Sequence, residues 1–220
     1  MFKSKIVTYF LIAATCTFLA GCASPKPVAY KDIPSSAYLK PNLSNKSERI
    51  PYSYEIPVNW KSYANIIVDQ VAVYRGPDNQ FEEVSEDDKS STAHYMYAQF
   101  IGKLSSRFNI VSTPGPNTLR LKLTLTGITK TTPVLGTVSR LDLMGALYNG
   151  VQSFRGGEGT FTGSVFYVVE IYDASNSNLL SAYIVKQYPN SLNIGASIGA
   201  LAAARTGIEK GAEMIVEQLR

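Results

Sequence analysis

Leu119-Arg120-Leu121-Lys122-Leu123-Thr124-Leu125-Thr126 places a leucine at every second position, with a polar side chain after each one. Side chains alternate between the two faces of a β-strand, so this stretch predicts a strand with one buried face and one wet face. A strand of this kind favours antiparallel pairing. The rest of the predicted sheet is placed around it.

Four further strands are predicted, two before this stretch and two after it. Residues 160–172 and 179–188 are rich in β-branched and aromatic residues, and the turn-forming residues 173–178 between them predict a hairpin. Upstream, residues 63–74 are apolar on both faces, which predicts a central strand covered on both sides. A shorter strand is expected over residues 108–111.

Two amphipathic helices complete the pattern. The first has an apolar stripe from Ala93 to Phe108, and the acidic residues 82–88 precede it, at the end where the helix dipole favours negative charge. The second is expected from about Asn193 to Leu219. The order of elements predicts a single α+β domain with a mostly antiparallel sheet of about five strands and two main helices.

A hydrophobic, glycine-containing insertion, residues 133–159, separates two of the strands. Its apolar residues recur at near-helical spacing, and Gly145 and Gly150 interrupt it, so it is too short and too broken to span a bilayer. One interpretation is an amphipathic helix that caps one face of the sheet. The other is a surface for a partner, made of Leu141, Met144, Leu147, Tyr148, Val151 and Phe154.

The first 21 residues have the features of a secretory signal peptide. Lys3 and Lys5 precede an apolar run over residues 6–18, and Leu19-Ala20-Gly21-Cys22 resembles a bacterial lipobox. We therefore expect signal-peptide residues 1–21, a lipidated Cys22 that begins a Ser/Pro-rich tether over residues 22–49, and a periplasmic domain over residues 50–220. Within the tether, Tyr30, Tyr38 and Leu39 are expected to pack loosely on the domain.

Composition limits the partners. Without Lys3 and Lys5 the chain keeps 19 basic and 17 acidic side chains, a balance that does not call for nucleic acid. Cys16 lies in the apolar core of the signal peptide, and lipidation would consume Cys22, so we expect neither a disulfide nor a cysteine metal site. Ala23 and Ser24 lack the aspartate associated with inner-membrane retention, which favours the outer membrane, facing the periplasm.

The sequence contains none of the common catalytic motifs. It has no His-Glu-x-x-His, no Gly-x-Ser-x-Gly and no phosphate-binding loop, and its single histidine, His94, is expected at the surface of the first helix. Asp69 and Glu170 lie in predicted strands and could face each other, which is weak support for acid-base chemistry. We therefore predict no cofactor, no metal and no enzymatic activity.

Several short motifs resemble a known family. Tyr38-Leu39-Lys40-Pro41, Ile50-Pro51-Tyr52 and Ile67-Val68-Asp69-Gln70-Val71, followed by Gly115-Pro116, are similar to the proteobacterial lipoproteins of domain of unknown function 3313. That family usually has proline where this sequence has Gln70. The resemblance implies lipidation and a single α+β domain, and it brings no activity and no catalytic residues.

Three hypotheses for function follow. The first is a non-enzymatic envelope lipoprotein, anchored in the membrane through Cys22, whose residues 133–154 dock on an envelope protein. The second is a module that binds a small apolar or glycan ligand through Tyr148, Tyr167 and Tyr172. The third, a hydrolase of envelope polymers, lacks a recognisable nucleophile with its base.

Overall fold

The leucine-alternating stretch forms the centre of a sheet. The computed structural model describes residues 25–43, 49–131, 163–190 and 199–220. The stretch lies in β6 (Thr118–Thr129), and its four leucines are each at most 1% exposed, whereas Arg120, Lys122 and Thr124 between them are partly exposed. The predicted strand with one dry and one wetter face is confirmed.

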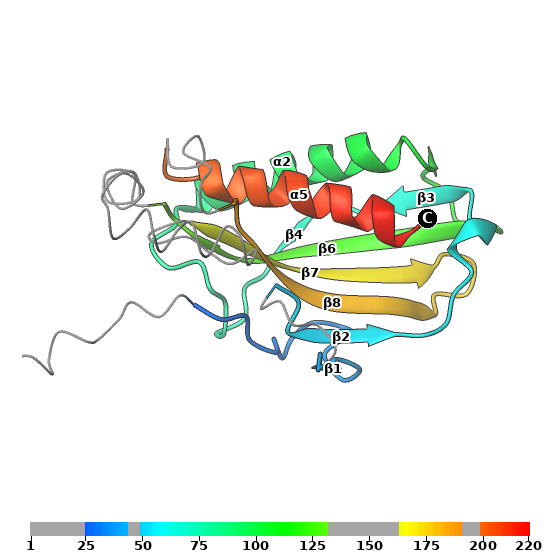
Figure 1. Ribbon diagram of the computed structural model, residues 1–220, viewed down its shortest axis with the longest axis horizontal. Helices are drawn as coiled ribbons and strands as arrows, with labels where there is room; N and C mark the ends of the chain where they lie inside the picture. The colour runs from blue at the N-terminus through cyan, green and yellow to red at the C-terminus, as the bar shows by residue number, and fades with distance from the viewer. Residues whose placement is uncertain (1–24, 44–48, 132–162, 191–198) are drawn as a thin grey trace, which may run out of the picture.

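The sheet is mixed, with the strand order β1-β2-β8-β7-β6-β3-β5 and β4 as a further partner of β6 (Figure 1). On one side of β6 the pairing is antiparallel, and the strands are β7 (Ser164–Asp173), β8 (Leu179–Gln187), β2 (Tyr52–Glu55) and β1 (Lys40–Pro41). On the other side it is parallel, and the strands are β3 (Asn65–Val68), β4 (Ala72–Val73) and β5 (Asn109–Ile110). The α+β class is confirmed, and the strands beyond the expected five are two to four residues long.

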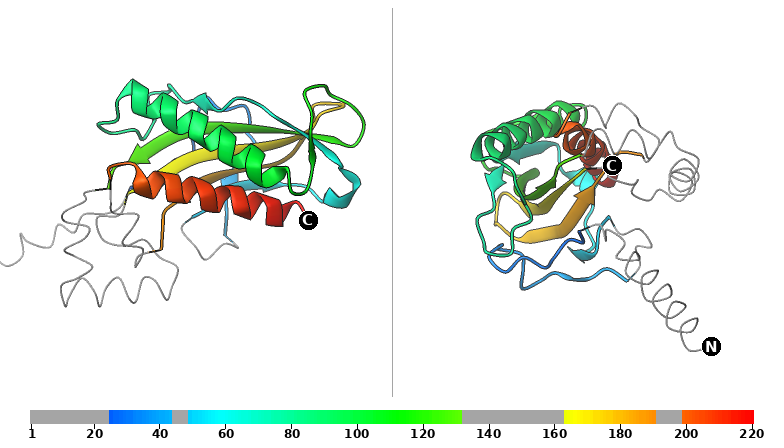
Figure 2. Two further views of the ribbon diagram at one scale, coloured as in Figure 1. Left: turned by 90° about the horizontal axis from the view of Figure 1, so that it is seen from above. Right: turned by 90° about the vertical axis from the view of Figure 1, so that its left-hand side faces the viewer.

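Two helices cover one face of this sheet (Figure 2). α2 (Glu86–Leu104) begins after Ser85, whose hydroxyl accepts the Asp88 N–H at 3.1 Å, and its first turn holds three acidic residues. Capping and the helix dipole explain the acidic stretch, as predicted. α5 (Ala202–Gln218) packs beside α2, and residues 193–198 of the predicted helix lie outside the described residues. A one-turn 3-10 helix, η2 (Trp60–Ser62), precedes β3.

The main core fills the space between the helices and the sheet. Phe100 of α2 packs edge-on against Tyr167 of β7 with ring centroids 6.1 Å apart, and both side chains are almost fully buried. Gly211 lets α5 approach β7, because a Cβ there would overlap the Tyr167 hydroxyl. The helix positions are therefore set by close packing on β7.

An N-terminal strap, defined here as residues 25–43, lies against the opposite face of the sheet. Tyr30 and Ile33 are 1% and 6% exposed and form a second apolar cluster with Tyr74, Val168 and Ile184. This corrects the expectation of a tether over residues 22–49, for the part that the structure describes. The reason is that β7 is buried on both faces up to Ile171, and in the described part of the chain no helix is available to cover the second face.

The single strand expected over residues 63–74 is two strands in the structure. Val68 of β3 is opposite Leu121, whereas Ala72 of β4 is opposite Thr124, so three residues of this segment face two residues of β6. One extra residue produces a bulge, which interrupts the ladder and turns nearby side chains out of it. Asp69 and Gln70 lie in this interruption.

The candidate residues at the N-terminus and in the insertion lie outside the described residues. These are Cys22 and the predicted partner surface of Leu141, Met144, Leu147, Tyr148, Val151 and Phe154. Neither helix of the described chain combines the length and the apolar character needed to cross a membrane.

Candidate functional site: a groove beside the strap

An open groove of about 660 Å³ lies on the face of the sheet that the helices leave uncovered. Three segments line it: residues 32–34 of the strap, the chain around the β3–β4 interruption, and the wetter face of the central strands with Lys122, Thr124 and Glu170. The bulge that splits the expected strand is therefore also the feature that opens one wall of the groove.

Glu170 is the buried carboxylate of the groove. It is 2% exposed, and its Oε1 accepts the backbone N–H of Ser35 at 2.8 Å and the hydroxyl of Tyr172 at 3.1 Å. Lys122 is opposite Glu170 in the β6–β7 register, and its Nζ lies 4.9 Å from the centre of the Tyr172 ring. Burial, together with the charge of Glu170, raises the pKa of Tyr172 well above its ordinary value, so this phenol stays neutral and donates.

Asp69 is held by a different partner. The Arg120 Nε lies 3.1 Å and 2.9 Å from the two carboxylate oxygens of Asp69, and the hydrogen bond raises the pKa of Arg120. The Asp69 N–H also donates to the Leu121 carbonyl at 3.0 Å, which fixes the backbone at the start of the interruption. Both groups are partly exposed, so this ion pair orients the side chains more than it stabilises the fold.

The rim of the groove is tied to the strap. The Tyr74 hydroxyl donates to Asp78 Oδ1 at 2.6 Å, and the Lys31 N–H donates to the other oxygen of that carboxylate at 3.2 Å. The hydrogen bond from Tyr74 is the main cause that lowers the pKa of Asp78. Gly76 is required in this turn, because a Cβ at that position would overlap the Tyr74 ring. Strap and rim are thus fixed relative to each other.

The sequence predicted part of this arrangement. Asp69 and Glu170 do line one groove, but they do not share a proton or a common partner: one binds Arg120 and the other binds Ser35 and Tyr172. Two carboxylates that are each occupied by protein donors serve better as fixed acceptors than as a catalytic pair. His94 is exposed on α2, as expected.

The prediction that Tyr148, Tyr167 and Tyr172 together line one small-ligand pocket is wrong. Tyr167 points to the helices and packs on Phe100, whereas Tyr172 is on the opposite face, where it donates to Glu170. The physical reason is the two-residue alternation of a strand, which places residues 167 and 172 on opposite faces. Tyr148, the third member, lies outside the described residues.

Sequence reasoning missed Lys122, Arg120 and Tyr74 as site residues, although two signals were present. The alternation of β6 already placed Arg120, Lys122 and Thr124 on the same wet face. A single glutamate within the otherwise apolar Val165–Ile171 run was the second signal, since a buried carboxylate needs partners. In the described part of the chain, no group of three or more His, Cys, Asp or Glu side chains is arranged to hold a metal ion.

Comparison with known proteins gives one family match. A family model described as protein of unknown function (DUF3313) matches residues 29–215. No curated protein matches the sequence.

Two solved structures illustrate the distant structural similarities. A PelC dodecamer from Paraburkholderia phytofirmans is 14% identical with a TM-score of 0.37, over 73% of this chain and 92% of that one. Protein XCC0632 from Xanthomonas campestris, of the DUF330 family model, is 8% identical with a TM-score of 0.35, over 70% of this chain and 82% of that one. Similarities of this size carry no argument about what this chain does.

Proposed function

The chain belongs to the DUF3313 family of proteins of unknown function, and from this premise we propose that it is a lipid-anchored envelope lipoprotein that acts by binding and not by catalysis. The proposed anchor is Cys22, in the outer membrane and facing the periplasm. The lipobox-like Leu19–Cys22 and the charged, then apolar, residues before it support this anchor. Two or more acyl chains make such anchoring stable.

The observation that carries the binding function is the groove beside the strap. Its volume of about 660 Å³ falls within the range of about 300–1,000 Å³ that is usual for ligand sites. Its carboxylates at positions 69 and 170 already accept hydrogen bonds from protein groups, so their positions are set before any ligand arrives. A preorganised lining of this kind favours recognition over acid-base chemistry.

The proposed occupant is an extended segment of an envelope protein. The groove offers fixed carboxylate acceptors, the ammonium of Lys122 as a donor, and apolar side chains such as Ile33, Pro34 and Ala72. A peptide carries both N–H donors and carbonyl acceptors beside its side chains, and so matches a lining of mixed polarity. A small polar or glycan ligand is the second candidate, because the groove is also large enough for one.

The insertion remains the other proposed docking surface. Residues 133–154 were expected to capture a partner, and a charge introduced at Met144 or Leu147 is expected to abolish capture while leaving the fold intact. The groove and the insertion are separate proposals for where the same partner binds.

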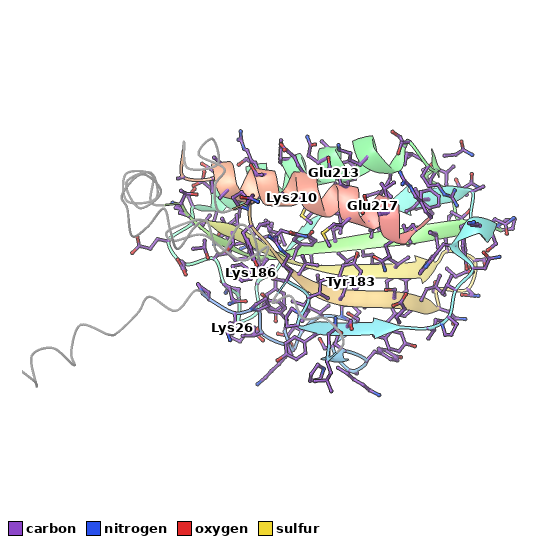
Figure 3. All side chains as sticks on the ribbon, in the orientation of Figure 1. Lys26, Tyr183, Lys186, Lys210, Glu213 and Glu217 are labelled. Carbon is purple, nitrogen blue, oxygen red and sulfur yellow. The ribbon has the colours of Figure 1, made fainter. Side chains whose placement is uncertain are left out.

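Photocrosslinking in intact cells distinguishes them. A photoreactive amino acid is placed at Gln70 in the groove, at Leu147 in the insertion, or at Glu217 on the exposed side of α5 as the control (Figure 3). A specific crosslink to one envelope protein from Gln70, and none from Glu217, supports the groove. Crosslinks from Leu147 alone would assign docking to the insertion. With no crosslink from either, native mass spectrometry of the purified protein tests for a bound small ligand.

A further inference from the structure

The strap fixes the chain to the domain from Pro25 onward. The Lys186 Nζ donates to the Pro25 carbonyl at 2.8 Å, and the Gln80 Nε2 donates to the Lys26 carbonyl at 2.9 Å. The Tyr30 hydroxyl then donates to Gln80 Oε1 at 2.6 Å, and the Tyr30 ring lies 5.2 Å from the Tyr74 ring, edge-on. The strap therefore leaves the domain at one defined place, beside β8 and the rim of the groove.

This attachment shortens the distance between the domain and the proposed anchor. Cys22 precedes Pro25 by three residues, and an extended chain spans at most about 3.5 Å per residue, so the link reaches about 10 Å. The tether of about 25 residues expected from composition would have reached several times further. A lipid on Cys22 would thus hold the face that carries the strap directly against the bilayer.

We propose that the exposed side of the strap is a membrane-apposed surface that lies on phospholipid headgroups and fixes the orientation of the domain. This proposal rests on the proposed lipidation of Cys22 and adds to it which face of the domain meets the lipid. The helices, on the opposite face of the sheet, then point away from the membrane (Figure 2).

The distribution of exposed apolar side chains supports this surface. Among the described residues, five large hydrophobic side chains are exposed, and three of them belong to the strap: Val28 at 38%, Tyr38 at 50% and Leu43 at 94%. The strap is only 19 of the described residues, so this is a local concentration. Aliphatic side chains and tyrosine are the residue types that partition into the headgroup region.

The distribution of charged side chains also distinguishes the strap from the helices. The strap carries three exposed lysines, Lys26, Lys31 and Lys40, and one aspartate, Asp32, so it is basic. α2 and α5 together carry six acidic and four basic side chains and are acidic. Figure 3 shows Lys26 at the edge of the molecule opposite α5, where Glu213 and Glu217 are labelled. Anionic lipid attracts the strap side and repels the helix side.

The test uses the full-length protein, purified from membranes and reconstituted in vesicles of phosphatidylethanolamine and phosphatidylglycerol. Single Leu43→Cys, Val28→Cys and Met214→Cys variants carry a fluorescent label, and the vesicles contain a lipid with a nitroxide on its headgroup. Met214 on α5 is the matched control, because it is 39% exposed, almost the same as Val28, but lies on the helix side. Labels at positions 28 and 43 should be quenched at least several-fold more strongly than the label at position 214.

The outcomes separate the two proposals. If mass spectrometry finds the acyl groups on Cys22 and the label at Met214 is quenched as strongly as the labels at Val28 and Leu43, the membrane-apposed surface is rejected and the anchor stands. If Cys22 is found without acyl groups, the proposed lipoprotein itself fails.

The contribution of charge is tested separately. Replacing Lys26, Lys31 and Lys40 by glutamate should weaken the quenching at positions 28 and 43 in the acylated protein. Unchanged quenching would show that these lysines do not attract the strap to the lipid.

Discussion

The backbone N–H of Ser35 donates a 2.8 Å hydrogen bond to Oε1 of Glu170, 135 positions later in the chain. Ser35 is fully buried and Glu170 is 2% exposed, so the contact is made out of water, where an unpaired carboxylate would be costly. It joins the strap to the second central strand of the sheet. The strap is therefore part of the fold and forms one wall of the groove.

Replacing Glu170 should show what this contact contributes. Glu170→Ala leaves the buried Ser35 N–H without its acceptor, and we expect a loss of about 1–3 kcal/mol in the free energy of unfolding. Glu170→Gln keeps an oxygen in place and should cost about 1 kcal/mol or less. Urea denaturation measures both, with the exposed Glu217→Ala as the control, expected within about 0.5 kcal/mol of wild type. Equal losses for alanine and glutamine would refute the assigned hydrogen bond.

Tyr30 tests whether the strap belongs to the core. The side chain is 1% exposed, so Tyr30→Ala should destabilise the protein by about 3–5 kcal/mol, as for other large buried aromatic residues. Tyr30→Phe removes only the hydrogen bond to Gln80 and should cost about 1 kcal/mol. The half-exposed Tyr38, replaced by alanine, is the comparison within the same segment. An effect of Tyr30→Ala as small as that of Tyr38→Ala would mean that the strap does not stabilise the domain.

Because of Asp78, the free energy of unfolding should decrease at acidic pH. Its pKa in the folded protein is lowered from the ordinary 3.8, mainly by the hydrogen bond from Tyr74, so the unfolded chain binds the proton more tightly. The resulting stability is present above pH 3.8 and is lost as the pH falls through the lower, folded value. Asp78→Asn and Tyr74→Phe should each flatten the fall in the urea midpoint between about pH 5 and pH 2. A slope identical to that of wild type in both variants would contradict the pairing.

Two helical glycines should respond to alanine with opposite signs. Gly102 on α2 has open space around its Cβ position, so Gly102→Ala should stabilise the protein by up to about 1 kcal/mol. At Gly211 the new methyl group would overlap the Tyr167 hydroxyl, and we expect a loss of about 1–3 kcal/mol. Adding Tyr167→Phe should recover part of that loss. Stabilisation by Gly211→Ala alone would show that α5 does not approach β7 as closely as described.

Local patterns of the sequence predict the elements that are organised by periodicity. The leucine alternation of β6, the turn residues 173–178 and the acidic start of α2 each depend on neighbours within a few positions, and each was predicted correctly. The strands β1 and β2 have two and four residues and are too short to show a periodicity, so the sheet has more strands than expected.

The strap and the groove depend on contacts between distant positions. A Ser/Pro-rich segment with isolated apolar residues has the composition of a tether, and nothing local shows that Tyr30 fills a space beside Val168 and Ile184. Likewise, the interruption after Val68 follows from a register difference against β6, which only the pairing reveals. Asp69 and Glu170 could be singled out from the sequence, but their separate partners could not.

The lipid anchor is tested most directly by the mass of the N-terminal peptide of the protein purified from cell membranes. We predict that the mature chain begins at Cys22, with a diacylglyceryl group on its sulfur and a further acyl chain on its amino group. A chain that keeps Met1, or one that begins elsewhere with Cys22 unmodified, would contradict the lipid anchor, and with it the placement of the strap at the membrane.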